Sequence, residues 1–148
     1  FEELVEDYDA ARPSYPQALY DEIGALGDCL ELGAGTGIAS NELAKQGRLT
    51  VTDLGPKMLA KGLPKHGRPG DVCRAEALPF ADRTFDTVCG AQMWHWVDKV
   101  LAPVEVARVL RPGGRLLLWW NETQPANLWW GDRQQDRLED GNPRYSRG

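Results

Sequence analysis

Three glycines in five residues, Gly33, Gly35 and Gly37, come soon after a short apolar run and directly follow the Glu31–Leu32 pair. Glycine tolerates positive φ and has no side chain, so such a loop lets a ligand approach the backbone closely. A phosphate-binding loop requires a Gly-Lys pair followed by Ser or Thr, which this loop lacks. A dinucleotide loop requires its third glycine at position 38, where this chain has Ile38.

Two carboxylates near the loop favour a ligand that carries both an ammonium group and a ribose. Glu31 would repel a pyrophosphate and attract an ammonium group, while the loop amides and the following helix N-terminus can receive a carboxylate. Asp53 lies 20 residues after Gly33, and a carboxylate there can accept hydrogen bonds from ribose hydroxyls. An amino acid joined to a ribose suggests S-adenosylmethionine. The alternatives are a plain strand-end charge for Glu31 and a helix N-cap for Asp53, since Pro56 follows shortly.

Short apolar runs alternate with helical patterns, and these elements must position the loop and its carboxylates. Strands are expected over residues 28–32, 48–53, 72–75, 85–91 and 115–120. Helices are expected over residues 16–26, 38–46, 56–62 and 100–110. Segments 63–70 and 111–114 are rich in Pro and Gly, which predicts a loop and a turn.

The alternation predicts an α/β fold of the Rossmann-like, doubly wound kind: a mainly parallel sheet with helices on both faces. About five strands are visible, and the last apolar run, residues 115–120, is expected to be covered on both faces. Ligands in such sheets bind at the carboxyl ends of the strands, where the strand order reverses. The glycine loop is expected at one of those ends.

Composition narrows the class of protein. The 148 residues suffice for one domain with its own core, and a net charge of −5 disfavours nucleic acid as a partner. No segment approaches the roughly 20 apolar residues of a membrane span. Cys29, Cys73 and Cys89 form no CxxC pair, so no metal site or disulfide framework is indicated. We interpret them as free thiols of a cytoplasmic protein.

Five motifs follow one another along the chain: ELGAGTG (31–37), VTDLGPKMLAKG (51–62), AEALPFADRTFDTV (75–88), AQMWHWVD (91–98) and ARVLRPGGRLLLWWN (107–121). Together they resemble class I S-adenosylmethionine-dependent methyltransferases, in particular the small-molecule group that includes the ubiquinone/menaquinone-biosynthesis and trans-aconitate methyltransferases. The opening YDAARPSYP (8–16) resembles the lead-in of this group. The resemblance implies transfer of a methyl group from S-adenosylmethionine to a small-molecule acceptor, with S-adenosylhomocysteine as product.

The resemblance also implies a division of the chain. Residues 1–121 are expected to form the cofactor-binding domain, with residues 1–16 as a lead-in over the cofactor. Residues 122–148 are polar and are interpreted as an incomplete acceptor-binding part or a tail. The last two of the family's usual seven strands are not evident. Oligomeric state and the identity of the acceptor stay open.

Cofactor contacts follow from the same resemblance. Around the methionine part we expect Gly33, Ala34, Gly35, Glu31, Tyr8 and Arg12. Asp53 is expected to bind the ribose. Around the adenine we expect Leu54, Met58, Ala75, Glu76 and Ala77. Arg12 is alternatively a surface residue, Met58 a core residue and Glu76 a solvated one.

Residues after the fourth expected strand should face the transferable methyl group. Gln92 is expected to touch the cofactor, and Trp94 and His95 to contact the acceptor. Histidine is the residue that most often serves as a general base, and the alternative for His95 is a structural histidine packed between tryptophans. Two other functions stay open: a binding module that is inactive alone or needs a partner, and a nicotinamide-dependent oxidoreductase, which Glu31 and Ile38 disfavour.

Overall fold

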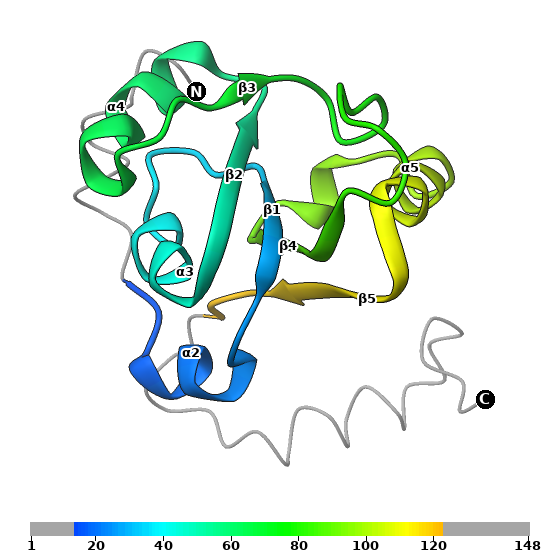
Figure 1. The fold of residues 1–148 in the computed structure, drawn as a ribbon. Helices are drawn as coiled ribbons and strands as arrows, with labels where there is room; N and C mark the ends of the chain where they lie inside the picture. The colour runs from blue at the N-terminus through cyan, green and yellow to red at the C-terminus, as the bar shows by residue number, and fades with distance from the viewer. Residues whose placement is uncertain (1–13, 123–148) are drawn as a thin grey trace, which may run out of the picture.

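The computed structural model describes residues 14–122, so the expectations for Tyr8, Arg12 and residues 123–148 lie outside the described residues. Five strands form one sheet in the order β3-β2-β1-β4-β5, with every pairing parallel (Figure 1). The strands are β1 (Gly27–Leu32), β2 (Gly47–Asp53), β3 (Asp71–Val72), β4 (Phe85–Ala91) and β5 (Leu110–Trp119). The helices are α2 (Gln17–Ile23), α3 (Ser40–Gln46), α4 (Pro56–His66) and α5 (Leu101–Val109), with the 3-10 helix η2 (Trp94–Trp96).

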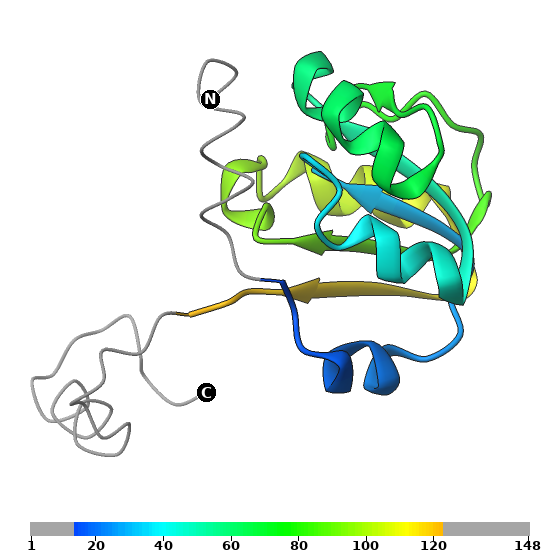
Figure 2. The ribbon, with the colours of Figure 1, turned by 90° about the vertical axis from the view of Figure 1, so that its left-hand side faces the viewer.

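Helices cover both faces of the sheet, and each face has its own core (Figures 1 and 2). On one face, Tyr20, Leu43 and Leu59 from α2, α3 and α4 pack on Cys29 and Val51 of the strands. On the other face, α5 packs on a second cluster that includes Leu30 and Val88. The strand order reverses between β1 and β4, because β2 and β3 lie on one side of β1 and β5 lies on the other. The expected doubly wound Rossmann-like fold is therefore confirmed.

Two helix ends differ from the expected ones. Helix α2 ends at Ile23, because Gly24 adopts φ +67° and its N–H donates to the Tyr20 carbonyl, so Gly27 starts β1 instead of ending the helix. Helix α4 runs to His66, although residues 63–70 were expected to be a loop. Pro64 lies inside it, and left-handed Gly67 caps the longer helix by donating to the Leu63 carbonyl.

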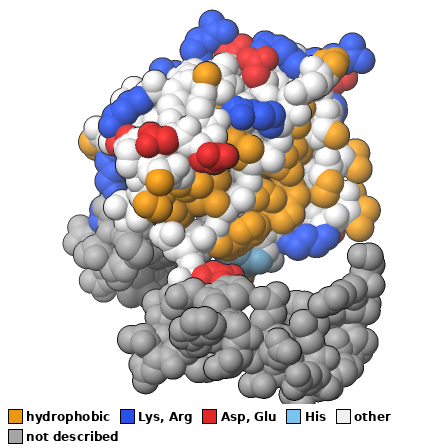
Figure 3. All heavy atoms as spheres, turned by 90° about the horizontal axis from the view of Figure 1, so that it is seen from below, with side chains coloured by type: hydrophobic (Ala, Val, Ile, Leu, Met, Phe, Trp, Pro, Cys, Tyr) orange, Lys and Arg blue, Asp and Glu red, His pale blue; other side chains and the backbone are white. Residues whose placement is uncertain are grey.

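Strand β5 also differs from expectation. Residues 111–114 belong to the strand and bulge opposite Asp86, since Phe85 pairs with Leu110 and Thr87 pairs with Arg115. Its outer edge has no neighbour within residues 14–122, and Leu116 is 37% exposed. The expectation that β5 is covered on both faces is wrong for the described chain. Figure 3 shows apolar side chains gathered on the underside of the molecule, the side of β5.

Other bounds shift by a few residues. Helix α3 starts at Ser40 rather than Ile38, because residues 35–39 form turns. Strand β3 is limited to Asp71–Val72, and Pro103 lies in the first turn of α5, where proline is tolerated. No helix in the described part of the chain has the length and apolarity needed to cross a membrane.

Candidate functional site

A pocket of about 530 Å³ opens at the carboxyl edge of the sheet, where the strand order reverses. It lies among the loops that follow β1, β2, β3 and β4. Its lining residues are Leu32, Gly33, Gly35, Thr52, Asp53, Leu54, Gly55, Met58, Cys73, Arg74, Ala75, Glu76, Ala91, Gln92, Met93, Trp96 and Val97. This is the position at which open α/β sheets bind their ligands.

The glycine loop follows β1 with φ +63° at Gly33 and φ +57° at Gly35. A Cβ on Gly33 would lie 2.8 Å from the Cβ of Met93, so the close packing of Met93 requires glycine there. A Cβ on Gly35 would have the Cε of Met58, at 3.7 Å, as its nearest contact. Gly35 therefore leaves room for a ligand against its backbone. Ala34 is buried and outside the pocket, and its N–H donates to the Thr52 carbonyl at 2.9 Å.

Asp53 ends β2 and connects two loops of the pocket. Its Oδ2 accepts the Gly35 N–H and its Oδ1 accepts the Gly55 N–H, each at 2.8 Å. Gly55, not Asp53, is the N-cap residue of α4, so the alternative role of Asp53 as a helix cap is wrong. Each carboxylate oxygen has two acceptor positions. One position on each oxygen is left over for a ligand that donates hydrogen bonds.

Glu31 lies beneath the glycine loop and is 1% exposed. It does not line the pocket, and its Oε2 accepts the Ser40 hydroxyl at 2.6 Å. Burial raises the pKa of Glu31 to about 7, with a further increase from the negative charge of Asp53 and a decrease from the Ser40 bond. Glu31 is therefore a buried carboxyl rather than a plain charge at a strand end.

The wall expected to face adenine is formed by α4 and the segment after β3. Leu54, 66% exposed, and the buried Met58 both line the pocket, and so do Ala75 and Glu76. Ala77 is exposed and lies outside the lining.

Glu76 is not simply a solvated residue. Its Oε1 accepts the backbone N–H of Asp98 at 2.7 Å, and Arg74 lies 3.5 Å from its other oxygen. The Asp98 bond, more than the neighbouring Arg74 charge, holds the pKa of Glu76 below its usual value.

The residues after β4 form the opposite wall. Gln92 lines the pocket with φ +57°, a conformation that side-chain-bearing residues rarely adopt. Its backbone N–H donates to the Trp119 carbonyl at 2.9 Å, and its side-chain amide donates to the Asn121 carbonyl at 3.3 Å. Trp96 also lines the pocket although it is 71% exposed. The end of β4 is thus fixed to the end of β5.

Trp94 and His95 lie in η2 beside the pocket and outside its lining. The Trp120 indole N–H donates to His95 Nδ1 at 3.5 Å, and the His95 ring lies 4.9 Å from the Trp96 ring. Because Nδ1 accepts this bond, a neutral His95 carries its proton on Nε2. The sequence analysis gave no site role to the lining residues Met93, Val97 and Cys73. The available signal was their position: Cys73 follows β3, Met93 comes two residues after β4, and Val97 follows η2.

The methyltransferase domain family has a sequence model that matches residues 30–118. This match covers more than half of the chain. The chain belongs to the methyltransferase family. A further relative is an uncharacterised methyltransferase of Mycobacterium tuberculosis, 42% identical over 136 residues that cover 88% of this chain and 55% of the relative. A demethylmenaquinone methyltransferase of a Mycobacterium species is 37% identical over 131 residues, which cover 84% of this chain and 54% of that protein.

A solved structure agrees with this membership. A protein from Anaeromyxobacter dehalogenans, assigned as a type II methyltransferase, superposes with a TM-score of 0.67 at 31% identity, covering 88% of this chain and 57% of that one. The methyltransferase domain described here spans about half the length of the curated relatives that it matches.

The family is one of S-adenosylmethionine-dependent enzymes, and two observations test whether this methyltransferase domain fits that cofactor. Asp53 lines the pocket and accepts one hydrogen bond on each carboxylate oxygen, which leaves acceptor capacity that suits ribose hydroxyls. Gly35 leaves its backbone open beside the apolar side chain of Met58. The residues present therefore fit a nucleoside amino acid.

Proposed function

We propose that the chain is an S-adenosylmethionine-dependent methyltransferase that acts on a small-molecule acceptor. The observation that carries this proposal is Asp53, which lines the pocket and whose carboxylate connects the two glycine-containing loops with one accepted hydrogen bond on each oxygen. A carboxylate at the end of the second strand is the group that binds ribose hydroxyls in nucleotide-binding sheets of this kind.

Each part of the cofactor has proposed binding residues. Asp53 holds the ribose, and Leu54, Met58, Ala75 and Glu76 of the lining hold the adenine, together with Ala77, which follows them in the chain. The backbone of Gly33, Ala34 and Gly35 holds the methionine part, together with Glu31 through its buried carboxylate. Tyr8, Arg12 and Gln92 complete the proposed set. The forked guanidinium of Arg12 suits a carboxylate.

When bound, the cofactor supplies a methyl group made electrophilic by the sulfonium. The chain's own residues bind and orient the reactants and exclude water, and orientation alone can lower a barrier by about 7–11 kcal/mol. Trp96, beside the pocket, presents an aromatic ring of the kind that attracts a nearby cation.

Trp94 and His95 are proposed to contact the acceptor. With Nδ1 bonded to Trp120, neutral His95 can donate a hydrogen bond through Nε2. To act as a general base it must release the Trp120 bond, because the lone pair on Nδ1 must either become free or, in the other tautomer, take up the proton. A carboxylate acceptor would need no base, whereas a phenol, an amine or a carbon acid would need one.

The proposal includes a cytoplasmic setting, which is supported by the free thiols Cys29, Cys73 and Cys89. It includes no nucleic-acid partner and no resident metal. A similar protein is named for methylation of demethylmenaquinone, so a quinol-type ring belongs among the acceptors to be tried.

Calorimetric titration of the 148-residue chain tests the proposal. We expect saturable binding of S-adenosylmethionine and S-adenosylhomocysteine and no binding of NADH at the same concentrations. Binding of NADH with no heat from either sulfur nucleoside would instead favour an oxidoreductase and contradict the proposal.

A second candidate function is a cofactor-binding module that is inactive alone or completes its acceptor site with a partner. It is favoured by the exposed rim of the pocket at Trp96. Methyl transfer from labelled S-adenosylmethionine to any compound in an acceptor screen, by the isolated chain, would exclude this candidate.

A further inference from the structure

The pocket wall between β3 and β4 depends on side chains for its shape. We call residues 74–84 the wall segment. Apart from an isolated bridge between Arg74 and Ala77, these residues lie outside the strands and helices, yet Arg74, Ala75 and Glu76 line the pocket. A segment without a hydrogen-bonded ladder keeps one conformation only if other contacts hold its backbone.

Arg108 of α5 supplies such contacts. Its guanidinium donates to the Leu78 carbonyl at 3.1 Å, the Phe80 carbonyl at 2.8 Å and Asp82 Oδ1 at 2.8 Å. It also donates to both oxygens of Glu105, at 2.9 and 2.7 Å. A guanidinium has five N–H groups, and these five bonds engage all of them. Arg108 therefore holds three residues of the wall segment through one side chain.

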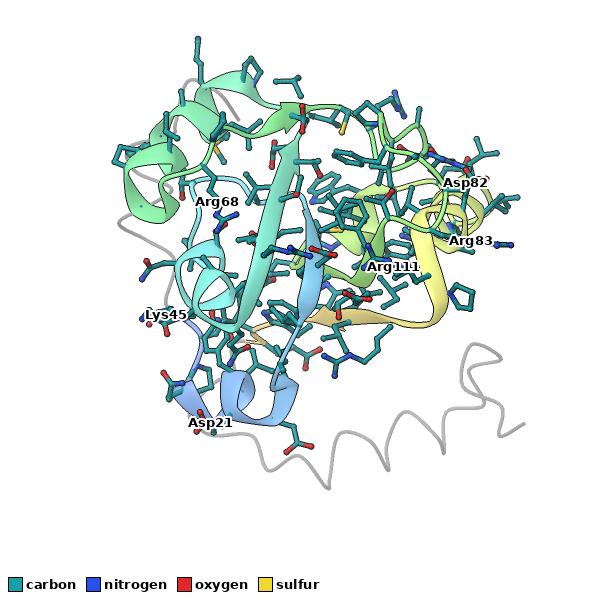
Figure 4. All side chains as sticks on the ribbon, viewed as in Figure 1. Asp21, Lys45, Arg68, Asp82, Arg83 and Arg111 are labelled. Carbon is teal, nitrogen blue, oxygen red and sulfur yellow. The ribbon has the colours of Figure 1, made fainter. Side chains whose placement is uncertain are left out.

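The backbone around Arg108 extends the same network. Glu105 Oε1 accepts the Leu78 N–H at 2.8 Å, so Leu78 is held through both its N–H and its carbonyl. The Arg83 N–H donates to the Arg108 carbonyl at 2.9 Å. Figure 4 shows Arg83 and Asp82 beside α5. Arg108 also holds the pKa of the Glu105 carboxyl below its usual value, which keeps this acceptor ionised.

The wall segment is attached to the start of α5 as well. Glu76 Oε1 accepts the Asp98 N–H at 2.7 Å. Asp98 Oδ1 in turn accepts the N–H groups of Val100 and Leu101 at 2.8 and 2.9 Å, at the first turn of the helix. Glu76 is thus bonded to the residue that bonds the start of α5, and Leu78, two residues further on, is bonded to Arg108 near the end of the same helix.

We propose that Arg108 is a positioning residue for the cofactor site, because it fixes the wall segment to α5 and thereby holds Ala75 and Glu76 at the proposed adenine-binding part of the pocket. This inference rests on the proposed function. Arg108 does not line the pocket, so its effect on ligand binding must pass through the wall segment. Loosening the wall weakens binding because the ligand must then order it.

Arg115 provides a matched control. Its guanidinium donates to the backbone carbonyls of Ile23 and Ala25, at 3.2 and 2.7 Å. Like Arg108 it fixes an irregular segment to a regular element, but this segment precedes β1 and lies at the amino edge of the sheet, opposite the pocket. Arg115→Met therefore reports how the loss of guanidinium bonds to backbone carbonyls far from the pocket affects ligand binding.

The experiment titrates S-adenosylhomocysteine and its hypoxanthine analogue, S-inosylhomocysteine, into the full chain and into Arg108→Met, Arg108→Lys and Arg115→Met. We expect Arg108→Met to weaken S-adenosylhomocysteine binding by roughly tenfold or more, the equivalent of one lost charge-assisted hydrogen bond. We also expect it to reduce the preference for adenine over hypoxanthine. Arg108→Lys, with three N–H groups, should be intermediate and also serves if Arg108→Met does not fold. Arg115→Met should stay within about twofold of the wild type, because its bonds lie outside the pocket wall.

Hydrogen exchange of the free chains adds a readout that needs no ligand. Amides of residues 75–84 should exchange faster in Arg108→Met, and those of residues 23–27 should not. If the wild type and both Arg108 variants bind equally, the positioning role of Arg108 is overturned while the proposed function stands. Unchanged amide exchange rates in the wall segment would overturn the positioning role in the same way. A wild-type chain that binds no S-adenosylhomocysteine contradicts the proposed function itself, and the cofactor role of Arg108 with it.

Discussion

Glu31 combines full burial with a titration near neutral pH. Because its pKa is about 7 in the folded chain and 4.5 for an ordinary glutamate, the folded state binds the proton more tightly than the unfolded state does. This contribution to stability is complete below pH 4.5 and is lost as the pH rises through 7. The total change is on the order of 3 kcal/mol.

We therefore expect Glu31→Gln to remove a pH dependence of stability. Relative to wild type, the free energy of unfolding of Glu31→Gln should rise by about 2–3 kcal/mol between pH 5 and pH 8, because only the wild type must then bury a charge. Urea unfolding at the two pH values measures this difference. Glu22→Gln on the exposed side of α2 is the control, and an equal pH dependence in both variants would show that Glu31 titrates normally.

Gly33 and Gly35 are expected to respond differently to the same change. Gly33→Ala drives a methyl group into Met93 at a positive φ, so it should lower the free energy of unfolding by about 2 kcal/mol or more. Gly35→Ala has room for its methyl group and should cost only about 1 kcal/mol for the left-handed conformation. Its methyl group narrows the ligand site, so Gly35→Ala should lose more affinity for S-adenosylhomocysteine than its small loss of stability would explain. Urea denaturation and calorimetric titration of both variants check this. If the loss of affinity were proportional to the loss of stability in both variants, the prediction would be contradicted.

At the scale of the elements, α4 shows where local sequence signals misled. Pro64 and Gly62 predicted a helix end, but tertiary packing of Met58 and Leu59 and the cap at Gly67 carry the helix to His66. Pro64 still removes one helical hydrogen bond.

We therefore expect Pro64→Ala to raise the free energy of unfolding by about 1 kcal/mol. This is a net value, because the regained helical hydrogen bond is partly offset by the greater conformational entropy of an unfolded chain without the proline. Thermal and urea denaturation give the value. Pro79→Ala, in an exposed position outside any helix, is the matched control and should not stabilise. A destabilised Pro64→Ala variant would show that proline is favourable in this helix.

The features that the sequence predicted correctly are those determined by residues close together in the chain. Strand β4 has the expected bounds because Phe85 to Ala91 is a compact β-forming run, and the glycine spacing placed the loop correctly. Residues 111–114 look like a turn by composition, and only pairing with β4 makes them a bulge. Likewise, no local signal says that Glu31 bonds Ser40, that Gly33 accommodates Met93, or that Arg108 reaches Leu78, since these contacts depend on how elements pack.

At the scale of the whole molecule, the pocket gathers loops from four strands, so a ligand there links both faces of the sheet. A ligand that binds only the folded state stabilises it by about 2.7 kcal/mol at a hundred times its Kd. We expect saturating S-adenosylhomocysteine to raise the Tm by roughly 5–10 °C for a domain of this size. Thermal denaturation with NADH as the comparison ligand measures it, and an unchanged Tm at saturation would contradict binding to the folded domain.

The central claim is that the Asp53 carboxylate binds the ribose of a nucleoside amino acid. The most direct measurement is a double-mutant cycle by calorimetry: wild type and Asp53→Asn, each with S-adenosylhomocysteine and with its analogue lacking both ribose hydroxyls, and with Asp71→Asn as the control variant. We expect the wild type and Asp71→Asn to lose roughly 10- to 100-fold in affinity for the dideoxy analogue, and Asp53→Asn to bind both compounds equally weakly. If Asp53→Asn instead discriminates between the two compounds as well as the wild type does, Asp53 does not bind the ribose and the account is contradicted.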